Sequence, residues 1–157
     1  MTWHRHLGVY GICYQEGRLL VVHKTNGPYR NRYDLPGGTV EPQETLPEAL
    51  EREFMEEAGL EVEVLRQAGI GEYVVPSPIR EHSHIQHLAI LFEAACSVPT
   101  SFRTDRRSDD AKGAEWVSLA DISADNASPL VLSAKLYLAG DPNAFASRKL
   151  DTWIVKA

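Results

Sequence analysis

The chain gathers five glutamates and one arginine into ten consecutive residues. These are Glu48, Glu51, Arg52, Glu53, Glu56 and Glu57. They give the segment a formal charge of −4, while the whole chain carries only −6, so the acidity of this protein is local. Carboxylate oxygens clustered without histidine or cysteine are ligands that favour Mg²⁺ or Mn²⁺ over Zn²⁺. The segment therefore predicts a site for a hard divalent cation.

The spacing of these acids would place two of them on the apolar side of a helix. At about 100° per residue, Glu57 falls in the same sector as Leu46 and Leu50, and Glu53 falls at the edge of that sector. An amphipathic helix normally turns its charges toward solvent, and acids three or four residues apart repel each other by roughly 0.2–0.5 kcal/mol a pair. Arg52 supplies one positive charge against three acids, so we expect bound cations to offset the remainder.

Local signals define the helix that carries these acids. Thr45 followed three residues later by Glu48 fits a capping box, in which each side chain bonds the other residue's backbone amide. Pro47 lies in the first turn, where a missing amide hydrogen is harmless, and Gly59 is a typical helix terminator. The sequence therefore predicts a helix over residues 46–58.

The remaining patterns predict strands and one more helix around this element. Apolar, β-branched runs indicate a hairpin over 7–14 and 18–23, strands over 62–75, 85–96 and 115–117, a helix over 129–139 and a last strand over 153–155. Polar loops are expected over 25–34, 76–83 and 97–113. Strands interleaved with two helices favour an α/β class, with a mixed sheet flanked by helices.

Composition limits the classes of protein that this chain can belong to. A length of 157 residues predicts one domain over 1–157. No apolar run approaches the ~18 residues of a membrane span. Residues 1–6 lack the apolar stretch expected of a secretory signal, and no basic tract suggests stable nucleic-acid binding. Cys13 and Cys96 are far apart and belong to no CxxC pair, which favours reduced thiols in a cytoplasmic protein. A homodimer stays an open alternative.

The acidic segment and the residues before it resemble a known family signature. Gly38, Glu44 after five residues, and then Arg52-Glu53-Phe54-Met55-Glu56-Glu57-Ala58-Gly59-Leu60 after seven more are similar to the signature of the Nudix hydrolases, in the MutT-like pattern. The match spans residues 38–60. Phe54 replaces the usual aliphatic residue, and Gln43 stands where a glycine commonly precedes the glutamate.

The resemblance implies a fold, an activity and roles for particular residues. The fold would be the Nudix-type α/β/α sandwich with a mixed β-sheet. The activity would be Mg²⁺- or Mn²⁺-dependent hydrolysis of the pyrophosphate bond in a nucleoside diphosphate linked to another moiety, such as ADP-ribose, a nucleotide sugar or an oxidised nucleoside triphosphate. The implied metal ligands are Glu53, Glu56, Glu57 and the backbone carbonyl of Gly37. Arg52 and Glu44 would orient these carboxylates.

The general base and the substrate-binding residues stay open at this stage. Glu53 is the first candidate for the base, with Glu115 or an acid in a loop as the reserve. In the loop over 25–34, Arg30, Arg32 and Tyr33, with the neighbouring Tyr29, suit contact with phosphate and stacking on a base. They suit a solvated loop equally well.

A proline and three histidines allow more than one interpretation, and two rival functions stay open. Pro76 lies at the offset where ADP-ribose-cleaving members of this family often carry a proline, but the loop there would hold prolines in any case. His82, His84 and His87 are more typical of surface or substrate-lining histidines than of a zinc site. A nucleotide-binding module without turnover is one rival. An isoprenoid diphosphate isomerase, which would need a reactive cysteine, is another.

Overall fold

The computed structural model describes residues 2–108 and 110–157 as strands packed between two α-helices. The helices are α1 (Leu46–Ala58) and α2 (Pro129–Leu138), with a single 3₁₀ turn η1 (Leu119–Asp121). The strands are β1 (Thr2–Ile12), β2 (Tyr14–Gln15), β3 (Arg18–Lys24), β4 (Tyr33–Asp34), β5 (Gly37–Thr39), β6 (Glu63–Pro76), β7 (His82–Ala95), β8 (Arg103–Arg107), β9 (Ala111–Ser118) and β10 (Arg148–Lys149). No helix in the described part of the chain is long and apolar enough to cross a membrane.

The strands form two sheets. In the larger sheet the order is β10-β6-β7-β1-β5, with β1 parallel to β7 and antiparallel to β5, so this sheet is mixed. In the second sheet, β2, β3, β9 and β8 follow one another in antiparallel pairs, and β4 adds to β3. The chain passes from one sheet to the other directly after β1.

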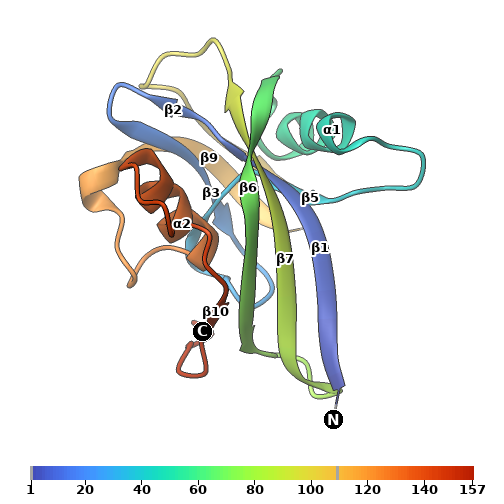
Figure 1. Ribbon diagram of the computed structural model, residues 1–157. Coiled ribbons are helices and arrows are strands. Elements are labelled where there is room, and N and C mark those ends of the chain that lie inside the picture. The colour runs from blue at the N-terminus through green and yellow to red at the C-terminus, as the bar shows by residue number, and fades with distance from the viewer. Residues whose placement is uncertain (1, 109) are drawn as a thin grey trace.

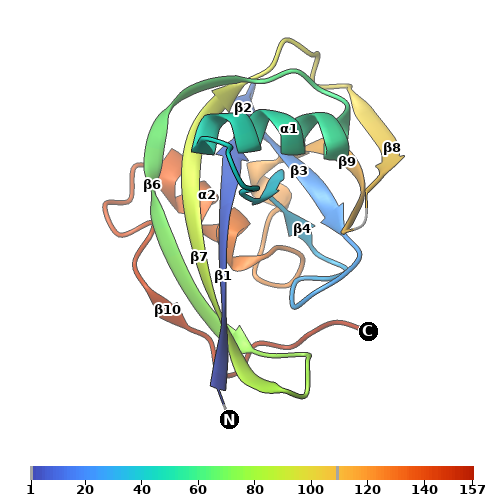
Figure 2. The same cartoon turned by 90° about the vertical axis from the view of Figure 1, so that its right-hand side faces the viewer.

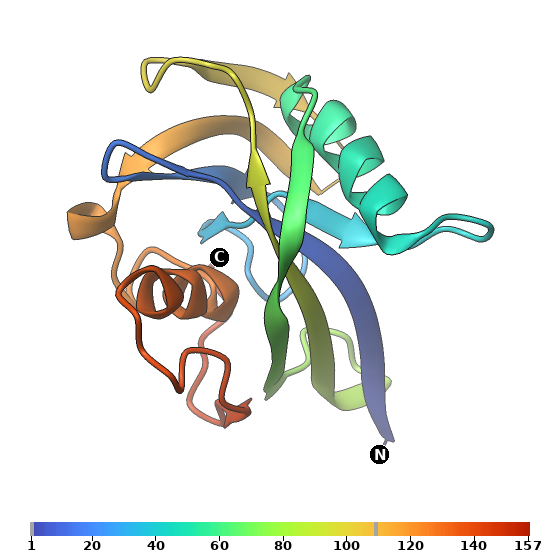
Figure 3. The same ribbon diagram turned by 45° about the horizontal axis from the view of Figure 1, so that its top comes forward.

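The two helices lie on opposite sides of the strands, α1 on one side and α2 on the other (Figures 1 and 2). Figure 3 shows the same layers from above. Central strands are buried on both faces: in β3, Leu19 and Val21 join the α2 core, while Leu20 and Val22 join the α1 core. This alternation follows from the two-residue period of a strand. The expected α/β/α arrangement with a mixed sheet is confirmed.

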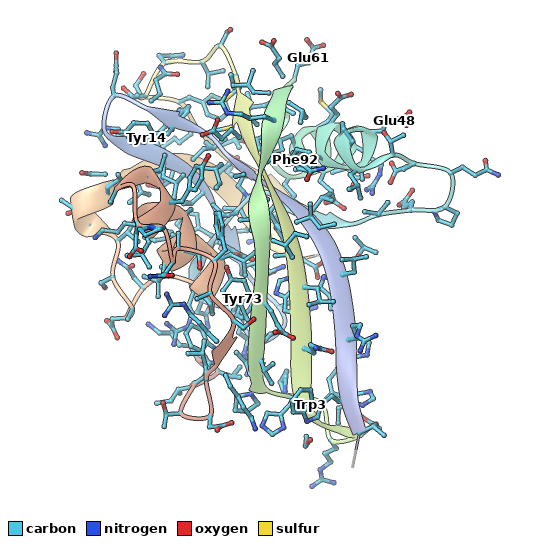
Figure 4. All side chains as sticks on the ribbon, in the orientation of Figure 1. Trp3, Tyr14, Glu48, Glu61, Tyr73 and Phe92 are labelled. Atoms are coloured by element: carbon cyan, nitrogen blue, oxygen red, sulfur yellow. The ribbon has the colours of Figure 1, made fainter. Side chains whose placement is uncertain are left out.

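Single residues show the same division of the interior. Phe92 of β7 is buried in the core beneath α1, and Tyr73 of β6 is buried in the core beneath α2 (Figure 4). The Tyr73 hydroxyl donates to Ser133 Oγ of α2 at 2.7 Å. The larger sheet thus supports both helices, and α1 lies against β5 and β1 of this sheet.

Helix α1 has the predicted bounds and the predicted ends. The Glu48 amide donates to Thr45 Oγ1 at 3.3 Å and the Thr45 amide donates to Glu48 Oε1 at 3.0 Å, which completes the capping box. Gly59 ends the helix in the left-handed conformation, with φ of 67°. Both ends of the acid-bearing helix are therefore fixed by local chemistry.

Three expectations about strands need correction. The region over 97–113 is not a continuous loop, because it contains β8 and the start of β9. Strand β1 begins at Thr2 rather than Leu7, since its first half pairs with β7. Residues 153–155 form no strand, since Trp153 instead donates its indole N–H to Pro28 O at 3.0 Å. The second and third differences arise from partners that are distant in the sequence, whereas β8 pairs with the strand that follows it.

Candidate active site

The acids of α1 line a pocket of about 220 Å³ at the inner side of the helix. We call it the acidic pocket. It is lined by His6, Tyr10, Lys24, Gly37, Gly38, Thr39, Glu41, Arg52, Glu53, Glu56, Glu57, Ser108 and Asp110. The structure therefore brings the turn at 37–38 together with Arg52 and the three glutamates of the signature. Glu44 contacts this group through Arg52.

Glu57 is the most deeply buried of these acids, with 5% of its surface exposed. Its Oε1 accepts a hydrogen bond of 2.9 Å from the Gly37 amide. Burial disfavours the charged form and raises the pKa of Glu57 to about 8, although the Gly37 amide and nearby Lys24 act in the opposite direction. Glu57 therefore holds its proton near neutral pH unless a cation replaces that proton.

The turn beside Glu57 requires two glycines for different reasons. Gly37 has φ of 150°, and a Cβ at this position would lie 2.0 Å from the Val9 carbonyl oxygen. A Cβ on Gly38 would lie 2.7 Å from the carboxylate carbon of Glu53. Gly37 thus permits the backbone turn, and Gly38 permits the close approach of the Glu53 carboxylate.

Glu53 occupies an environment of mixed charge. Burial raises its pKa, whereas a hydrogen bond of 3.1 Å from Arg52 Nη1 to Oε1 lowers it. Glu56 and Asp110 add like charges that raise it further. A carboxyl group with a raised pKa next to a guanidinium is suited to accepting a proton.

Arg52 connects the loop before α1 to the acids on the helix. Its Nε donates to Glu44 Oε2 at 2.7 Å and its Nη2 donates to Glu44 Oε1 at 3.0 Å, a two-point pairing. Nη2 also donates to Thr39 O at 2.9 Å, and Nη1 contacts Glu53 and Glu56 at 3.1 and 3.3 Å. The hydrogen bond from Arg52 is the main reason that the pKa of Glu44 is lowered. This geometry suits the orienting role expected for Arg52 and Glu44.

The chemistry of the pocket fits a hard divalent cation, but its carboxylates are not yet arranged around one. Within residues 2–108 and 110–157, no three His, Cys, Asp or Glu side chains already converge as a metal would require. Glu53 and Glu56 turn toward Arg52, and Glu57 toward the Gly37 amide. A cation would therefore need these glutamates to rotate away from their present partners. Their oxygens and the carbonyl of Gly37 are the donors that Mg²⁺ and Mn²⁺ accept.

Several residues of the pocket were not singled out from the sequence, among them His6, Tyr10, Lys24, Ser108 and Asp110. His6 and Tyr10 are four apart on β1, so they share one face of the strand, and their side chains lie 3.4 Å apart. Lys24 ends β3 directly before the polar loop. Asp110 lies in the loop expected over 97–113 and lines the pocket, and its carbonyl accepts from the Thr25 amide at 2.8 Å.

The proposed substrate-binding residues lie outside the acidic pocket. Arg32 is buried over the ring of Trp153 at 4.0 Å, and its guanidinium donates to the carbonyls of Ala124 and Ile154 at 3.0 and 3.1 Å. Arg30 Nε donates to Lys156 O at 2.7 Å. Both arginines therefore bind the C-terminal segment. Tyr33 instead faces a neighbouring pocket that contains Lys24.

Two other candidates are also separated from the acids. Glu115 Oε2 lies 2.6 Å from His23 Nε2 and lines a different pocket. Cys13 is buried in the core under α1 and Cys96 borders that core, and neither lines the acidic pocket. The geometry thus offers no cysteine for the isomerase alternative.

The histidines over 82–87 do not form a joint site. His87 is buried between two tyrosines, with Tyr10 Oη 2.8 Å from its Nε2 and Tyr29 Oη 2.9 Å from its Nδ1. Burial lowers the pKa of His87 to about 3, so its ring is neutral at ordinary pH. His82 and His84 pair with rings near the start of β1 instead.

Comparison with known proteins agrees with this geometry. A model of the NUDIX domain matches residues 2–136. An ADP-ribose pyrophosphatase of Methanocaldococcus jannaschii is 31% identical over 120 residues, which cover 76% of this chain and 65% of that protein. Phosphatase NudJ of Escherichia coli strain K12 is 30% identical over 140 residues, covering 86% of this chain and 84% of that protein. The low-salt glycan biosynthesis protein Agl8 of Haloferax volcanii is 37% identical over 83 residues, covering 52% of this chain and 53% of that protein. The chain therefore spans less than two thirds of the first and third of these relatives.

Solved structures share the fold at lower sequence identity. A NUDIX hydrolase from Nitrosomonas europaea is 23% identical with a TM-score of 0.68, covering 87% of this chain and 90% of that one. A MutT protein from Methanosarcina mazei is 22% identical with a TM-score of 0.64, covering 90% of this chain and 96% of that one. Because the domain match extends over most of the chain and includes the pocket's acids, this protein belongs to the Nudix hydrolase family.

Proposed function

We propose that this protein is a divalent-metal-dependent pyrophosphohydrolase that cleaves the phosphoanhydride bond of a small nucleotide-derived substrate. The observation that carries the proposal is the acidic pocket, where three glutamates of α1 meet a two-glycine turn. A buried carboxyl group whose pKa is about 8 is costly for a protein that has no cation to bind. The family membership and the names of two relatives support the same reaction class.

Each group in the pocket has a proposed task. Glu53, Glu56, Glu57 and the Gly37 carbonyl would hold Mg²⁺ or Mn²⁺. A metal bound there would neutralise charge on the pyrophosphate and would lower the pKa of a bound water molecule. Glu53 takes the proton of the attacking water, and Asp110 is the alternative base in the same pocket. Arg52 and Glu44 hold the carboxylates in place through the two-point pairing. Arg30 and Arg32 contribute indirectly, by fixing the loop that carries Tyr33.

The substrate proposed is a nucleoside diphosphate linked to another moiety, with ADP-ribose as the first compound to test. The relative from M. jannaschii is named for that substrate.

A cytoplasmic location, expected from two cysteines that remain free thiols, is part of the same proposal.

The test is hydrolysis of a substrate panel with Mg²⁺ by the wild type and by Glu53→Gln and Glu57→Gln. The panel contains ADP-ribose, dinucleoside polyphosphates, a nucleotide sugar, and canonical and oxidised nucleoside triphosphates. We expect both variants to lose at least 100-fold in kcat, since removal of a metal ligand or a base costs this much. Glu51→Gln is the matched control, because Glu51 lies on the same helix but faces solvent. Turnover that survives both substitutions contradicts the proposal, and nucleotide binding without any turnover favours the binding-module alternative.

A further inference from the structure

A row of four hydrogen-bonded aromatic side chains begins at the acidic pocket and runs into the core of the protein. His6 and Tyr10 line the pocket. The Tyr10 hydroxyl lies 3.4 Å from His6 Nε2 and 2.8 Å from His87 Nε2, and the Tyr29 hydroxyl lies 2.9 Å from His87 Nδ1. We call these four residues the aromatic row. Tyr10, His87 and Tyr29 are each 5% exposed or less, and the proposed function gives none of the four a task.

The protons of a buried row must be arranged so that every hydrogen bond has one donor and one acceptor. Burial lowers the pKa of His87 to about 3, so its ring is neutral and carries a single proton. One ring nitrogen of His87 therefore donates and the other accepts. The row has only two possible directions, which differ in the nitrogen that holds this proton.

Tyr29 decides between the two directions. Among the groups that the structure describes, its hydroxyl has no hydrogen-bond partner other than His87 Nδ1. If Nδ1 carried the proton of His87, the hydroxyl hydrogen of Tyr29 would be buried without an acceptor, which folded proteins largely avoid. Tyr29 therefore donates to Nδ1, and His87 donates from Nε2 to the Tyr10 oxygen. The Tyr10 hydrogen is then left for His6 Nε2, its one remaining partner in the described part of the chain.

This direction also fixes the proton of His6. Its Nε2 accepts from Tyr10, and burial, together with the charge of nearby Lys24, lowers the pKa of His6 and keeps its ring neutral. The single ring proton of His6 therefore lies on Nδ1. This nitrogen makes no hydrogen bond to any described group, and the side chain lines the acidic pocket. His6 thus offers a neutral N–H donor to a pocket in which ionised glutamates only accept.

From this order of protons we infer that His6 is a substrate-binding residue, which donates a hydrogen bond from Nδ1–H to a phosphate oxygen in the acidic pocket. Tyr10, His87 and Tyr29 are positioning residues that hold the tautomer of His6. The inference rests on the proposed function, because it places a phosphate beside the glutamates that would hold the metal. A neutral donor suits this place, since a bound divalent cation would repel a further positive charge close to it.

The same order of protons argues against two other tasks for His6. A metal ligand or a general base needs a ring nitrogen with an available lone pair. The lone pair of Nε2 is bonded to Tyr10, and Nδ1 holds the proton. Both alternatives would act on kcat, whereas a contact that is equal in the ground state and the transition state acts on KM.

Nitrogen NMR tests the direction of the row without any turnover, because the chemical shift of an imidazole nitrogen depends on whether it is protonated. In the metal-free protein at neutral pH, we expect the protonated shift at His87 Nε2 and at His6 Nδ1. Tyr29→Phe removes the donor to His87 and should move both His6 nitrogens toward an averaged shift. His82→Gln, which alters a ring outside the row, is the control and should leave them unchanged. A proton on His87 Nδ1 or on His6 Nε2 in the wild type overturns the inference.

Two substitutions of His6 then separate its nitrogens in kinetics. Asparagine can present an N–H near the position of Nδ1, and glutamine near that of Nε2. On the panel compound that the wild type cleaves best, His6→Gln should raise KM about tenfold with kcat within about threefold, since one hydrogen bond to a phosphate is lost. His6→Asn should keep KM within about threefold, and Tyr29→Phe should raise it about threefold at unchanged kcat. His82→Gln should change neither value.

Equal increases of KM in His6→Gln and His6→Asn, or a loss confined to kcat, would overturn the inference. If no panel compound is cleaved, the proposed function fails, and the contact is tested by adding inorganic pyrophosphate with Mg²⁺ to the nitrogen-labelled protein. A saturable change in the His6 Nδ1 shift, beyond the change that Mg²⁺ alone causes, then still supports the contact. Absence of that change overturns it.

Discussion

At the scale of single residues, adjacent glycines perform different tasks. Gly37 is required by the backbone, because its φ of 150° and the nearby Val9 carbonyl leave no room for a side chain. Gly38 is required by the site instead, because the three atoms nearest to a Cβ at this position all belong to the Glu53 carboxylate. Substitution by alanine should therefore affect stability at one position and activity at the other.

We predict that Gly38→Ala lowers kcat at least tenfold while the thermal midpoint changes by no more than a few degrees. The new methyl group would displace a flexible carboxylate, which costs little in stability but moves a reacting group. Gly37→Ala should instead destabilise the fold by about 1–3 kcal/mol, because a strained conformation and a backbone clash are added together. Thermal unfolding and steady-state kinetics on both variants check this. Equal loss of stability in the two would refute the distinction.

At the scale of elements, the site depends on one loop being attached to one helix. The segment from Gly38 to Thr45 has Arg52 as its main anchor to α1, through Glu44 and the Thr39 carbonyl. A lysine at this position keeps the charge but has no planar pair of donors for a carboxylate. The loop and the acids should then lose their common orientation.

We predict that Arg52→Lys lowers kcat at least tenfold with little change in KM. The substitution loosens the positions of Glu53 and Glu56 without removing any group that binds substrate. Arg18→Lys, on the exposed start of β3, is the control and should retain full activity. A rise in KM at unchanged kcat would show that Arg52 contacts substrate directly.

Elements also differ in how far the sequence alone could define them. Helix α1 could be placed to the residue because Thr45, Glu48 and Gly59 determine its ends locally. Strand β8 could not, since its own residues are mostly polar and charged and show no apolar alternation, so that only its pairing with β9 defines it. The acids of the site follow from their spacing on one helix. The other walls of the acidic pocket do not, because β1, β3 and the turn at 37–38 must meet in space to form them.

At the scale of the whole molecule, two buried groups give stability opposite dependences on pH. The pKa of His87 is lowered from 6.5 to about 3, so the unfolded chain binds the extra proton between these values and stability falls as the pH decreases. The pKa of Glu57 is raised from 4.5 to about 8, so the folded chain holds the extra proton and stability falls as the pH increases. The two effects oppose each other between pH 4.5 and 6.5.

We therefore predict that the metal-free protein is most stable on a plateau between about pH 4.5 and 6.5. Below it, His87 contributes a slope of up to about 1.4 kcal/mol per pH unit, and above it Glu57 contributes a slope of the same size and opposite sign. Urea unfolding from pH 3.5 to 8.5 measures both limbs. Glu57→Gln should remove the alkaline slope and His87→Gln the acidic slope. If each variant keeps the wild-type profile, other groups govern the pH dependence.

Because β3 is buried on both faces, a shift in its register would affect both cores of the protein. Its alternate residues belong to separate cores, and its last residue, Lys24, lines the acidic pocket. Inserting one residue in the tight turn at Glu16 and Gly17 would exchange the two sets of core side chains and rotate Lys24 away from the acidic pocket at the same time. A one-residue slip of this strand would thus disrupt the packing of both cores and the lining of the acidic pocket together.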